Sequence, residues 1–364
     1  RNTCSQAFII LTGANSYFSH LMLKPLLTDP EVFQLLRLVQ SARKIVICAH
    51  RSPDGDAVGA SLAWAQYLLS LGKQVSIIMP NPFPDFLRWL PGSHTISFYD
   101  KNESQAASII NDAHLIFCLD FNAFSRLQDM GKVIEKAKAD HVIIDHHLDP
   151  NCPQAKMIIS HPEMSSTCEL VFRLIYQLGG FDQMNKQGAA AIYTGMMTDT
   201  GGFTYNSNNP EIYLIISLLL TKGIDKDKIY RNVFNNYSEH RLRFTGYILN
   251  EKLRFLENNK ASIFTITREE MQRFHFIRGD AEGLVNMPLQ VKGMRLSISL
   301  REDTDKDVIR VSLRSVDDFP CNKMAEQFFN GGGHLNASGG ELPFPLEEAV
   351  KTAEKAIEAF REQL

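Results

Sequence analysis

Short runs of apolar residues recur along the first half of the chain, and each run ends at a polar cluster. Three of these runs occupy residues 45–47, 115–117 and 142–144 and are rich in β-branched side chains. Apolar runs of this length without polar alternation are typical of strands that are buried on both faces of a parallel sheet. Helical stretches separate the runs, so right-handed crossovers are expected between the strands. The pattern predicts an α/β domain with a parallel sheet and helices on both faces.

Cap signals indicate where the helices between these strands begin. Asp29 is the expected N-cap of the first helix, and a helix over about residues 58–71 follows the first strand. Residues 166–169 have the sequence Ser-Thr-Cys-Glu, which is the pattern of a capping box at a helix start. A helix rich in small residues, over 188–195, leads to Asp199.

The second half of the chain alternates between helical and extended patterns again. Strands are expected over 261–266, 295–300 and 308–313, after a helix over about 242–256 and before a terminal helix from residue 346. The stretch over 206–241 is helical and polar and carries no strand signal. The expected organisation is an N-terminal extension over 1–28, a first α/β domain over 29–205, a helical linker over 206–241 and a smaller α/β domain over 242–364.

The composition indicates which partners and which cellular location are expected for this protein. With 38 lysines and arginines against 41 acidic residues, the formal net charge of −3 argues against a protein that coats long nucleic acid. Residues 8–23 are apolar but too short and too polar to span a bilayer, so no membrane association is expected. The six cysteines form no C-x-x-C pair, and Cys48 and Cys118 lie inside apolar runs. We therefore expect buried free thiols and a reducing, cytoplasmic location.

The polar clusters that follow the apolar runs carry the candidate chemistry. They contain eight carboxylate and imidazole side chains: His50, Asp54, Asp56, Asp120, Asp145, His146, His147 and Asp199. The carboxyl ends of parallel strands meet at one crevice, so these side chains are expected to converge. Carboxylates mixed with imidazoles, without thiolates, suit divalent ions such as Mn²⁺ or Mg²⁺. Each cluster alone could be a solvated loop or a helix cap, but four such clusters together favour a metal centre.

Two motifs in the second half suit an anionic ligand. Arg314 and Ser315 end one expected strand, and three consecutive glycines precede His334. Consecutive glycines let backbone N–H groups approach an anion closely, and a guanidinium can bind phosphate through two hydrogen bonds. The alternative is a flexible glycine turn with a solvated histidine.

Taken in order, these motifs resemble those of the DHH phosphoesterase superfamily. The series is H-x-x-x-D-G-D, L-D, D-H-H, T-D-T-G, S-L-R-S and G-G-G-H, and the resemblance runs from about residue 30 to the end of the chain. It is closest to the two-domain branch with a C-terminal DHH-associated domain. That branch includes oligoribonucleases that also act on 3′-phosphoadenosine 5′-phosphate (pAp), and phosphodiesterases of cyclic-di-AMP or pApA.

The resemblance also implies roles for individual residues. It assigns a first metal ion to His50, Asp54 and Asp120. It assigns a second ion to Asp56, Asp120, His146 and Asp199, so that Asp120 bridges the two. The catalytic residues would be Asp120, His147 facing the scissile phosphate, and Asp145 supporting the histidines. The substrate-binding residues would be Arg126, Arg314, Ser315, Gly331, Gly332, Gly333 and His334.

The function that the resemblance implies is hydrolysis of short oligonucleotides to 5′-mononucleotides, with pAp as a further substrate. Two divalent ions are expected as cofactors, Mn²⁺ first, with Mg²⁺ or Co²⁺ as alternatives. Short single-stranded RNA or DNA is the expected partner, long nucleic acid is not, and a homodimer is left open. The alternative activity is hydrolysis of cyclic-di-AMP or pApA. A nucleotide-sensing binding protein is the alternative from another class, and the intact set of metal ligands argues against it.

Overall fold

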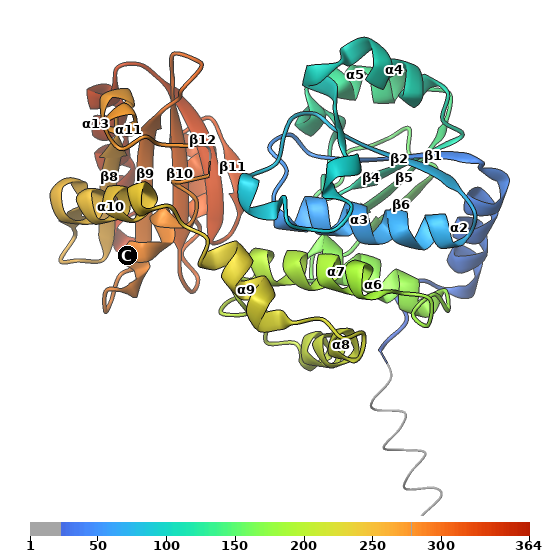
Figure 1. Ribbon diagram of the computed structural model, residues 1–364. Helices are drawn as coiled ribbons and strands as arrows, with labels where there is room; N and C mark the ends of the chain where they lie inside the picture. Colours follow the sequence, from blue (N-terminus) through green and yellow to red (C-terminus); the bar gives the residue numbers. More distant parts are fainter. Residues whose placement is uncertain (1–22, 278) are drawn as a thin grey trace, which may run out of the picture. The chain divides into compact units, whose positions relative to one another are not determined.

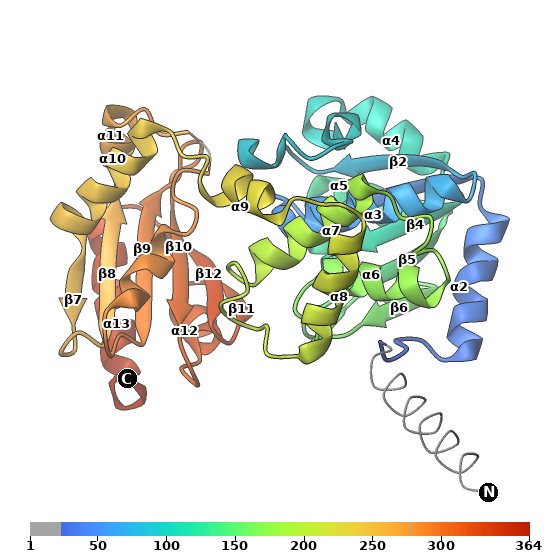
Figure 2. The same ribbon diagram turned by 60° about the horizontal axis from the view of Figure 1, so that its bottom comes forward.

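The computed structural model describes residues 23–277 and 279–364. Its contacts divide the chain into two units, one ending at Asn235 and the other spanning Asn236–Leu364 (Figures 1 and 2). The division falls inside the stretch 206–241 that the sequence suggests as a linker. Of the extension expected over 1–28, residues 1–22 lie outside the described part of the chain.

The first unit is built on a parallel sheet with the strand order β3-β2-β1-β4-β5-β6. The strands are β1 (Lys44–Ala49), β2 (Gln74–Met79), β3 (Ser97–Phe98), β4 (Leu115–Leu119), β5 (Asp140–Asp145) and β6 (Met157–Ser160). Every neighbouring pair is parallel, as the uninterrupted apolar runs predict. The chain passes from β1 outward to β2 and β3, and returns through β4 to the other side. The strand order therefore reverses between β1 and β4, where open α/β sheets bind their ligands.

Helices cover both faces of this sheet (Figure 1). The helices of this unit are α2 (Asp29–Ser41), α3 (Gly55–Ser70), α4 (Glu103–Asn111), α5 (Asp129–Lys136), α6 (Thr167–Gln177), α7 (Lys186–Asp199), α8 (Pro210–Thr221) and α9 (Lys226–Phe234). Alternate side chains of β1 point to opposite cores: Ile45 and Ile47 pack with α3, α6 and α7, whereas Val46 and Cys48 pack with α4 and α5. The predicted fold class is confirmed.

Two helix starts differ from the prediction. The N-cap of α2 is Thr28 rather than Asp29, because Thr28 forms a capping box with the Glu31 side chain. Helix α3 begins at Gly55, three residues before the predicted start, and its N-cap is Asp54, whose carboxylate accepts hydrogen bonds from the N–H groups of Asp56 and Ala57. The second difference matters for the site, because it fixes the Asp54 carboxylate at the end of a rigid helix.

The second unit contains a mixed sheet with the order β11-β12-β10-β9-β8-β7. Its strands are β7 (Arg254–Leu256), β8 (Ala261–Ile266), β9 (Leu296–Glu302), β10 (Val308–Ser315), β11 (Gly332–His334) and β12 (Ala337–Pro343). Its helices are α10 (Glu239–Tyr247), α11 (Arg268–Arg273), α12 (Cys321–Phe328) and α13 (Leu346–Ala359). Ile309, Val311 and Leu313 of β10 pack against α12 and α13. The helix predicted over 242–256 is wrong in its second half, where a π-helical turn, Ile248–Lys252, precedes the strand β7.

The described helices include none that is long and apolar enough to cross a membrane. The five cysteines in the described part, Cys48, Cys118, Cys152, Cys168 and Cys321, are free and buried.

Candidate metal centre

The loop after β1 carries the first group of candidate ligands. The ring of His50 is oriented by a contact of 2.8 Å between its Nδ1 and the Arg51 carbonyl. Its Nε2 then lies 3.4 Å from Asp120 Oδ2 and 3.8 Å from Asp54 Oδ2. Within the same loop Ser52 has a positive φ of 57°, which few residues adopt without support.

That support comes from Asn81, a residue that the sequence analysis did not identify. Asn81 follows β2 and is buried, and its Oδ1 accepts a hydrogen bond of 2.7 Å from the backbone N–H of Ser52. Its position after an apolar strand is the signal that could have identified it. The side chain fixes the turn that brings His50 and Asp54 to the same side.

The ends of β4 and β5 supply the centre of the site. Asp120 adopts a left-handed backbone with φ of 63°, and its N–H donates to the Ile144 carbonyl at 3.0 Å. A non-glycine residue in this region costs free energy, and such strain concentrates at functional sites. After β5, His147 donates through Nδ1 to Asp145 Oδ1 at 2.7 Å. Asp145 is fully buried, and its second oxygen has no hydrogen-bond partner among the described residues.

His146 approaches Oδ1 of Asp120, whereas His50 approaches Oδ2 of the same carboxylate. The Nε2 of His146 is 3.5 Å from Asp199 Oδ2, 3.7 Å from Asp120 Oδ1 and 3.9 Å from Asp56 Oδ2. Its Nδ1 is 3.3 Å from the Met164 carbonyl, which favours the tautomer with the proton on Nδ1 and the lone pair on Nε2. Asp199 is the last residue of α7, as the sequence indicates.

These side chains form two sets of possible metal ligands, and Asp120 of the first set also lies 3.7 Å from His146 of the second. One set is His50, Asp54 and Asp120, and the other is Asp56, His146 and Asp199; within each, one ligand atom per residue lies within 4.8 Å of the others. Two donors bound to one ion at about 2.1 Å each are separated by roughly 3–4 Å, which is the range seen here. Carboxylate and imidazole donors at this spacing fit two divalent ions. A third set, Asp120, Asp145 and His147, meets the same limit.

Negative charge dominates the centre. Burial raises the pKa of Asp56 well above its ordinary value, and the charges of Asp120 and Asp199 raise it further. Burial also raises the pKa of Asp120, but the hydrogen bond from His50 and the other imidazoles hold it well below its ordinary value. Burial lowers the pKa of His50, whereas Asp120 and Asp54 raise it to about 9. Positive charge therefore stabilises this cluster of carboxylates, and bound divalent cations can supply it in place of protons.

A second residue that sequence reasoning missed is Thr167. Its hydroxyl donates to Asp120 Oδ1 at 2.9 Å, and its backbone N–H donates to Asp56 Oδ2 at 2.6 Å. In the sequence it lies inside the predicted capping box, where its neighbours Ser166 and Glu169 account for the pattern. Ser166 is indeed the N-cap of α6.

Arg126 lies near the His50 side of the site. It is exposed on a 3₁₀ turn, Phe124–Leu127, and its carbonyl accepts a hydrogen bond of 2.9 Å from the Arg51 N–H. Its charge lowers the pKa of His50, and its backbone contact with Arg51 places the turn beside the loop that carries His50. An exposed cation there can attract an anionic substrate.

The candidate substrate residues of the second unit lie at the end of β10 and in β11. The Arg314 guanidinium donates to the Leu313 carbonyl at 2.9 Å. The Ser315 hydroxyl is buried and donates to the Phe319 carbonyl at 2.8 Å, so it also holds the adjacent loop. A Cβ at Gly331 would lie 1.8 Å from the Gly339 carbonyl oxygen, so glycine is required there. The glycines bring the backbone before His334 against β12.

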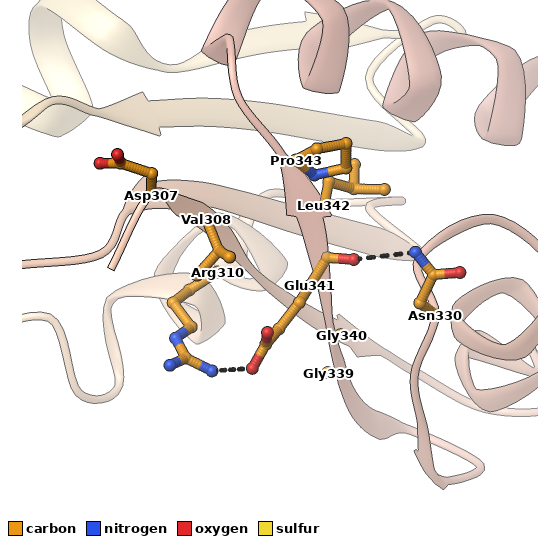
Figure 3. Close-up of a pocket in the computed structure, with 9 residues that line it drawn as sticks. All are labelled: Asp307, Val308, Arg310, Asn330, Gly339, Gly340, Glu341, Leu342 and Pro343. Carbon is orange, nitrogen blue, oxygen red and sulfur yellow. Dashed lines mark hydrogen bonds and ion pairs between the residues drawn. The ribbon is translucent and has the colours of Figure 1, made fainter. Parts of the chain in front are cut away.

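A separate hollow of about 570 Å³ lies over β10 and β12 of the second unit (Figure 3). It is lined by Asp307, Val308, Arg310, Asn330, Gly339, Gly340, Glu341, Leu342 and Pro343. Arg310 forms an ion pair with Glu341, and the Asn330 amide donates to the Glu341 carbonyl at 3.2 Å (Figure 3). Because Glu341 compensates the Arg310 charge, this hollow offers little attraction for phosphate. The predicted substrate residues are not among those that line it.

Comparisons with known proteins agree on both units. Residues 44–196 match the DHH family, N-terminal domain, and residues 263–363 match the DHHA1 domain. The chain is similar to the bifunctional oligoribonuclease and PAP phosphatase NrnA of Thermus thermophilus, with 27% identity over 92% of this chain and 96% of that protein. It is also similar to the cyclic-di-AMP phosphodiesterase GdpP of Bacillus subtilis, with 23% identity over 90% of this chain but 49% of that protein. A solved structure of an exopolyphosphatase-related protein from Bacteroides fragilis superposes with a TM-score of 0.90 at 50% identity, covering 94% of this chain and 99% of that one.

Proposed function

Since this chain belongs to the DHH family of phosphoesterases, we propose that it is a metal-dependent hydrolase that degrades oligonucleotides of a few residues to 5′-mononucleotides. It also removes the 3′-phosphate of pAp. The observation that carries this proposal is the convergence of carboxylates and imidazoles from the ends of β1, β4, β5 and α7 on one point. The bifunctional relative that matches this chain over nearly its whole length supports the same substrates.

The metal centre holds two divalent ions, Mn²⁺ by preference. His50, Asp54 and Asp120 hold one ion, and Asp56, Asp120, His146 and Asp199 hold the other. Bound ions of this kind activate water and neutralise the charge that develops on a phosphate group. Asp120 serves both ions, and the short distances from its two oxygens to His50 and His146 support that role.

His147 acts on the substrate, and Asp145 supports its ring. Asp145 keeps a proton on Nδ1 of His147, so the second ring nitrogen is the one directed at the scissile phosphate. In the doubly protonated ring, whose charge the Asp145 carboxylate balances, this nitrogen donates to a non-bridging oxygen, or gives its proton to the departing sugar oxygen and leaves the neutral ring with its proton on Nδ1. The exposed guanidinium of Arg126 attracts the phosphate to this side of the centre.

The second unit binds the remainder of the substrate. Arg314, Ser315 and His334 hold the far part of the nucleotide, and the glycines over 331–333 admit the anion to the backbone. This division of labour suits short substrates, because the chain is slightly acidic overall and offers no broad cationic surface for a long strand. The free buried cysteines suit the cytoplasm, where such substrates occur.

The test is a substrate panel with purified protein and Mn²⁺. We expect the highest kcat/KM for RNA of two to five nucleotides, release of 5′-mononucleotides, and conversion of pAp to AMP. An Asp120→Asn variant purified in parallel excludes a contaminating nuclease. A higher kcat/KM for cyclic-di-AMP or pApA than for short RNA and pAp would replace the proposal with the alternative that the GdpP relative suggests.

A further inference from the structure

The beginning of helix α6 is bonded directly to two carboxylates of the metal centre. Both oxygens of Asp56 accept backbone hydrogen bonds there, Oδ2 from Thr167 at 2.6 Å and Oδ1 from Cys168 at 2.8 Å. The Thr167 hydroxyl extends the contact to Asp120 Oδ1 at 2.9 Å. Asp56, Asp120 and Thr167 are 1%, 2% and 0% exposed, so water does not compete with these bonds.

The N–H groups of Thr167 and Cys168 and the Thr167 hydroxyl stabilise the ionised form of the two carboxylates. Hydrogen bonds to a carboxylate favour its charged state, and the N-terminus of a helix adds a favourable dipole. Each carboxylate oxygen has two lone pairs, so accepting one hydrogen bond leaves an oxygen able to bind an ion. Thr167 thus holds two neighbouring carboxylates in fixed orientations, against the repulsion between them.

The helix start is itself held by a buried network. The Ser166 hydroxyl accepts from the Glu169 N–H at 3.0 Å, and Glu169 Oε2 accepts from the N–H and hydroxyl of Ser165 at 2.8 and 2.6 Å. Arg173, 3% exposed, donates through Nε to Glu169 at 2.9 Å and also pairs with Glu211, at the start of α8. The network therefore ties α6 to the segment that follows Asp199.

We propose that Thr167 is the positioning residue of the metal centre, and that the α6 N-terminus sets its affinity for metal ions. The inference rests on the proposed metal centre and adds a residue that touches neither ion nor substrate. The hydroxyl of Thr167 orients Asp120, while the backbone of Thr167 and Cys168 orients Asp56. Loss of the hydroxyl leaves every ligand in place and releases the orientation of Asp120.

The experiment measures Mn²⁺ binding by calorimetry in the full chain after metal removal. Thr167→Val deletes the hydroxyl at nearly constant shape, and Thr167→Ser retains it. Thr194→Val is the matched control, because Thr194 is equally buried but its hydroxyl donates to the Ala190 carbonyl of its own helix. We expect Thr167→Val to weaken Mn²⁺ binding by roughly 10- to 100-fold, the range for residues that support a metal ligand. Thr167→Ser should restore the affinity to within about threefold of wild type, and Thr194→Val should leave it unchanged.

Melting in the presence of a chelator checks that each variant is folded. If Thr167→Val does not fold, the comparison of Thr167→Ala with Thr194→Ala decides the same question. Equal Mn²⁺ affinity in Thr167→Val and wild type overturns the inference but leaves the proposed function standing. A wild-type protein that binds no Mn²⁺ overturns the proposed metal centre itself, so the two failures are distinguishable. An equal loss in Thr194→Val would mean that the effect is general destabilisation, and would also overturn the inference.

Discussion

The imidazole of His147 donates through Nδ1 to Oδ1 of Asp145 at 2.7 Å, and Asp145 is fully buried beneath it. The carboxylate therefore selects the tautomer and the orientation of the ring. We expect Asp145→Asn to lower kcat by about 100-fold or more, because the neutral amide cannot balance the charge of the doubly protonated ring that donates from its second nitrogen. Steady-state kinetics and metal analysis together test this. An unchanged kcat at full metal content would contradict the role of the pair.

Asp120→Ala should remove more metal than any other change of a single ligand. Asp120 lies 3.4 Å from His50 and 3.7 Å from His146 through its two oxygens, so one substitution affects both donor sets. Elemental analysis after gel filtration should give less than one Mn²⁺ per chain, with no hydrolysis. Asp129→Ala is a suitable control, because Asp129 is exposed and pairs only with Lys132 among the described residues. Two full equivalents in an active Asp120→Ala variant would refute the bridging role.

The two adjacent histidines should respond in opposite ways. His146→Ala should empty one metal position, because Nε2 of His146 lies within 3.9 Å of three carboxylates. His147→Ala should retain metal and lose kcat, because its Nδ1 is committed to Asp145. Mn²⁺ content and kcat measured on both variants decide between them, and the reverse pattern would mean that the two assignments must be exchanged.

Activity should fall steeply once the substrate exceeds about five nucleotides, because only the few phosphates next to the reacting one find positive partners. Arg314→Ala or His334→Ala should raise KM for dinucleotides much more than for a chromogenic phosphodiester that carries a single phosphate. A ladder of single-stranded RNA tests the length limit. Processive degradation of a long strand that is unaffected by either substitution would show that the second unit does not select length.

Acid should destabilise the second unit through Asp303. Burial raises the pKa of Asp303, but hydrogen bonds from Arg310 and from the backbone of Asp305 and Lys306 lower it from 3.8 to about 2. The folded pKa is the lower one, so the stabilisation is present above about pH 4 and is lost as the pH falls towards 2. We expect Asp303→Asn to cost roughly 1–2 kcal/mol at pH 7 and much less near pH 2.5.

Urea unfolding of Asp303→Asn at the two pH values measures this difference. Asp307→Asn provides the comparison, because Asp307 pairs with Arg268 but its side chain is 85% exposed. A cost that is the same at both pH values would indicate that shape, not ionisation, explains the effect of Asp303→Asn.

The elements that the sequence predicts best are those whose burial requires an uninterrupted run of apolar residues. The strand β8 has the predicted bounds, because an apolar run flanked by turns leaves little choice. The two-residue strand β3 has no apolar run that would predict it, because it is defined by its pairing with β2 and not by its composition. The convergence of His50, Asp120 and His146 was also predictable, because parallel strands end on one side.

What could not be read from the sequence is the support around the ligands. Thr167 is one of several hydroxyl residues in a capping pattern, and only the approach of the start of α6 to the end of β4 reveals that it reaches Asp120. The same holds for Asn81, whose contact with Ser52 joins segments that are remote in sequence. Contacts of this kind depend on distances between elements, which local patterns do not encode.

The reversal of strand order between β1 and β4 has a consequence for folding. His50 and Asp199 are remote in sequence, and the donors meet only when the sheet and α7 are both assembled. An unfolded chain offers no comparable set of neighbouring donors, so we expect the ions of the proposed centre to bind late, after the slow, long-range strand pairing is complete. Metal ions should therefore slow unfolding and leave the refolding rate almost unchanged. Removing the metal should then shorten the lifetime of the native state.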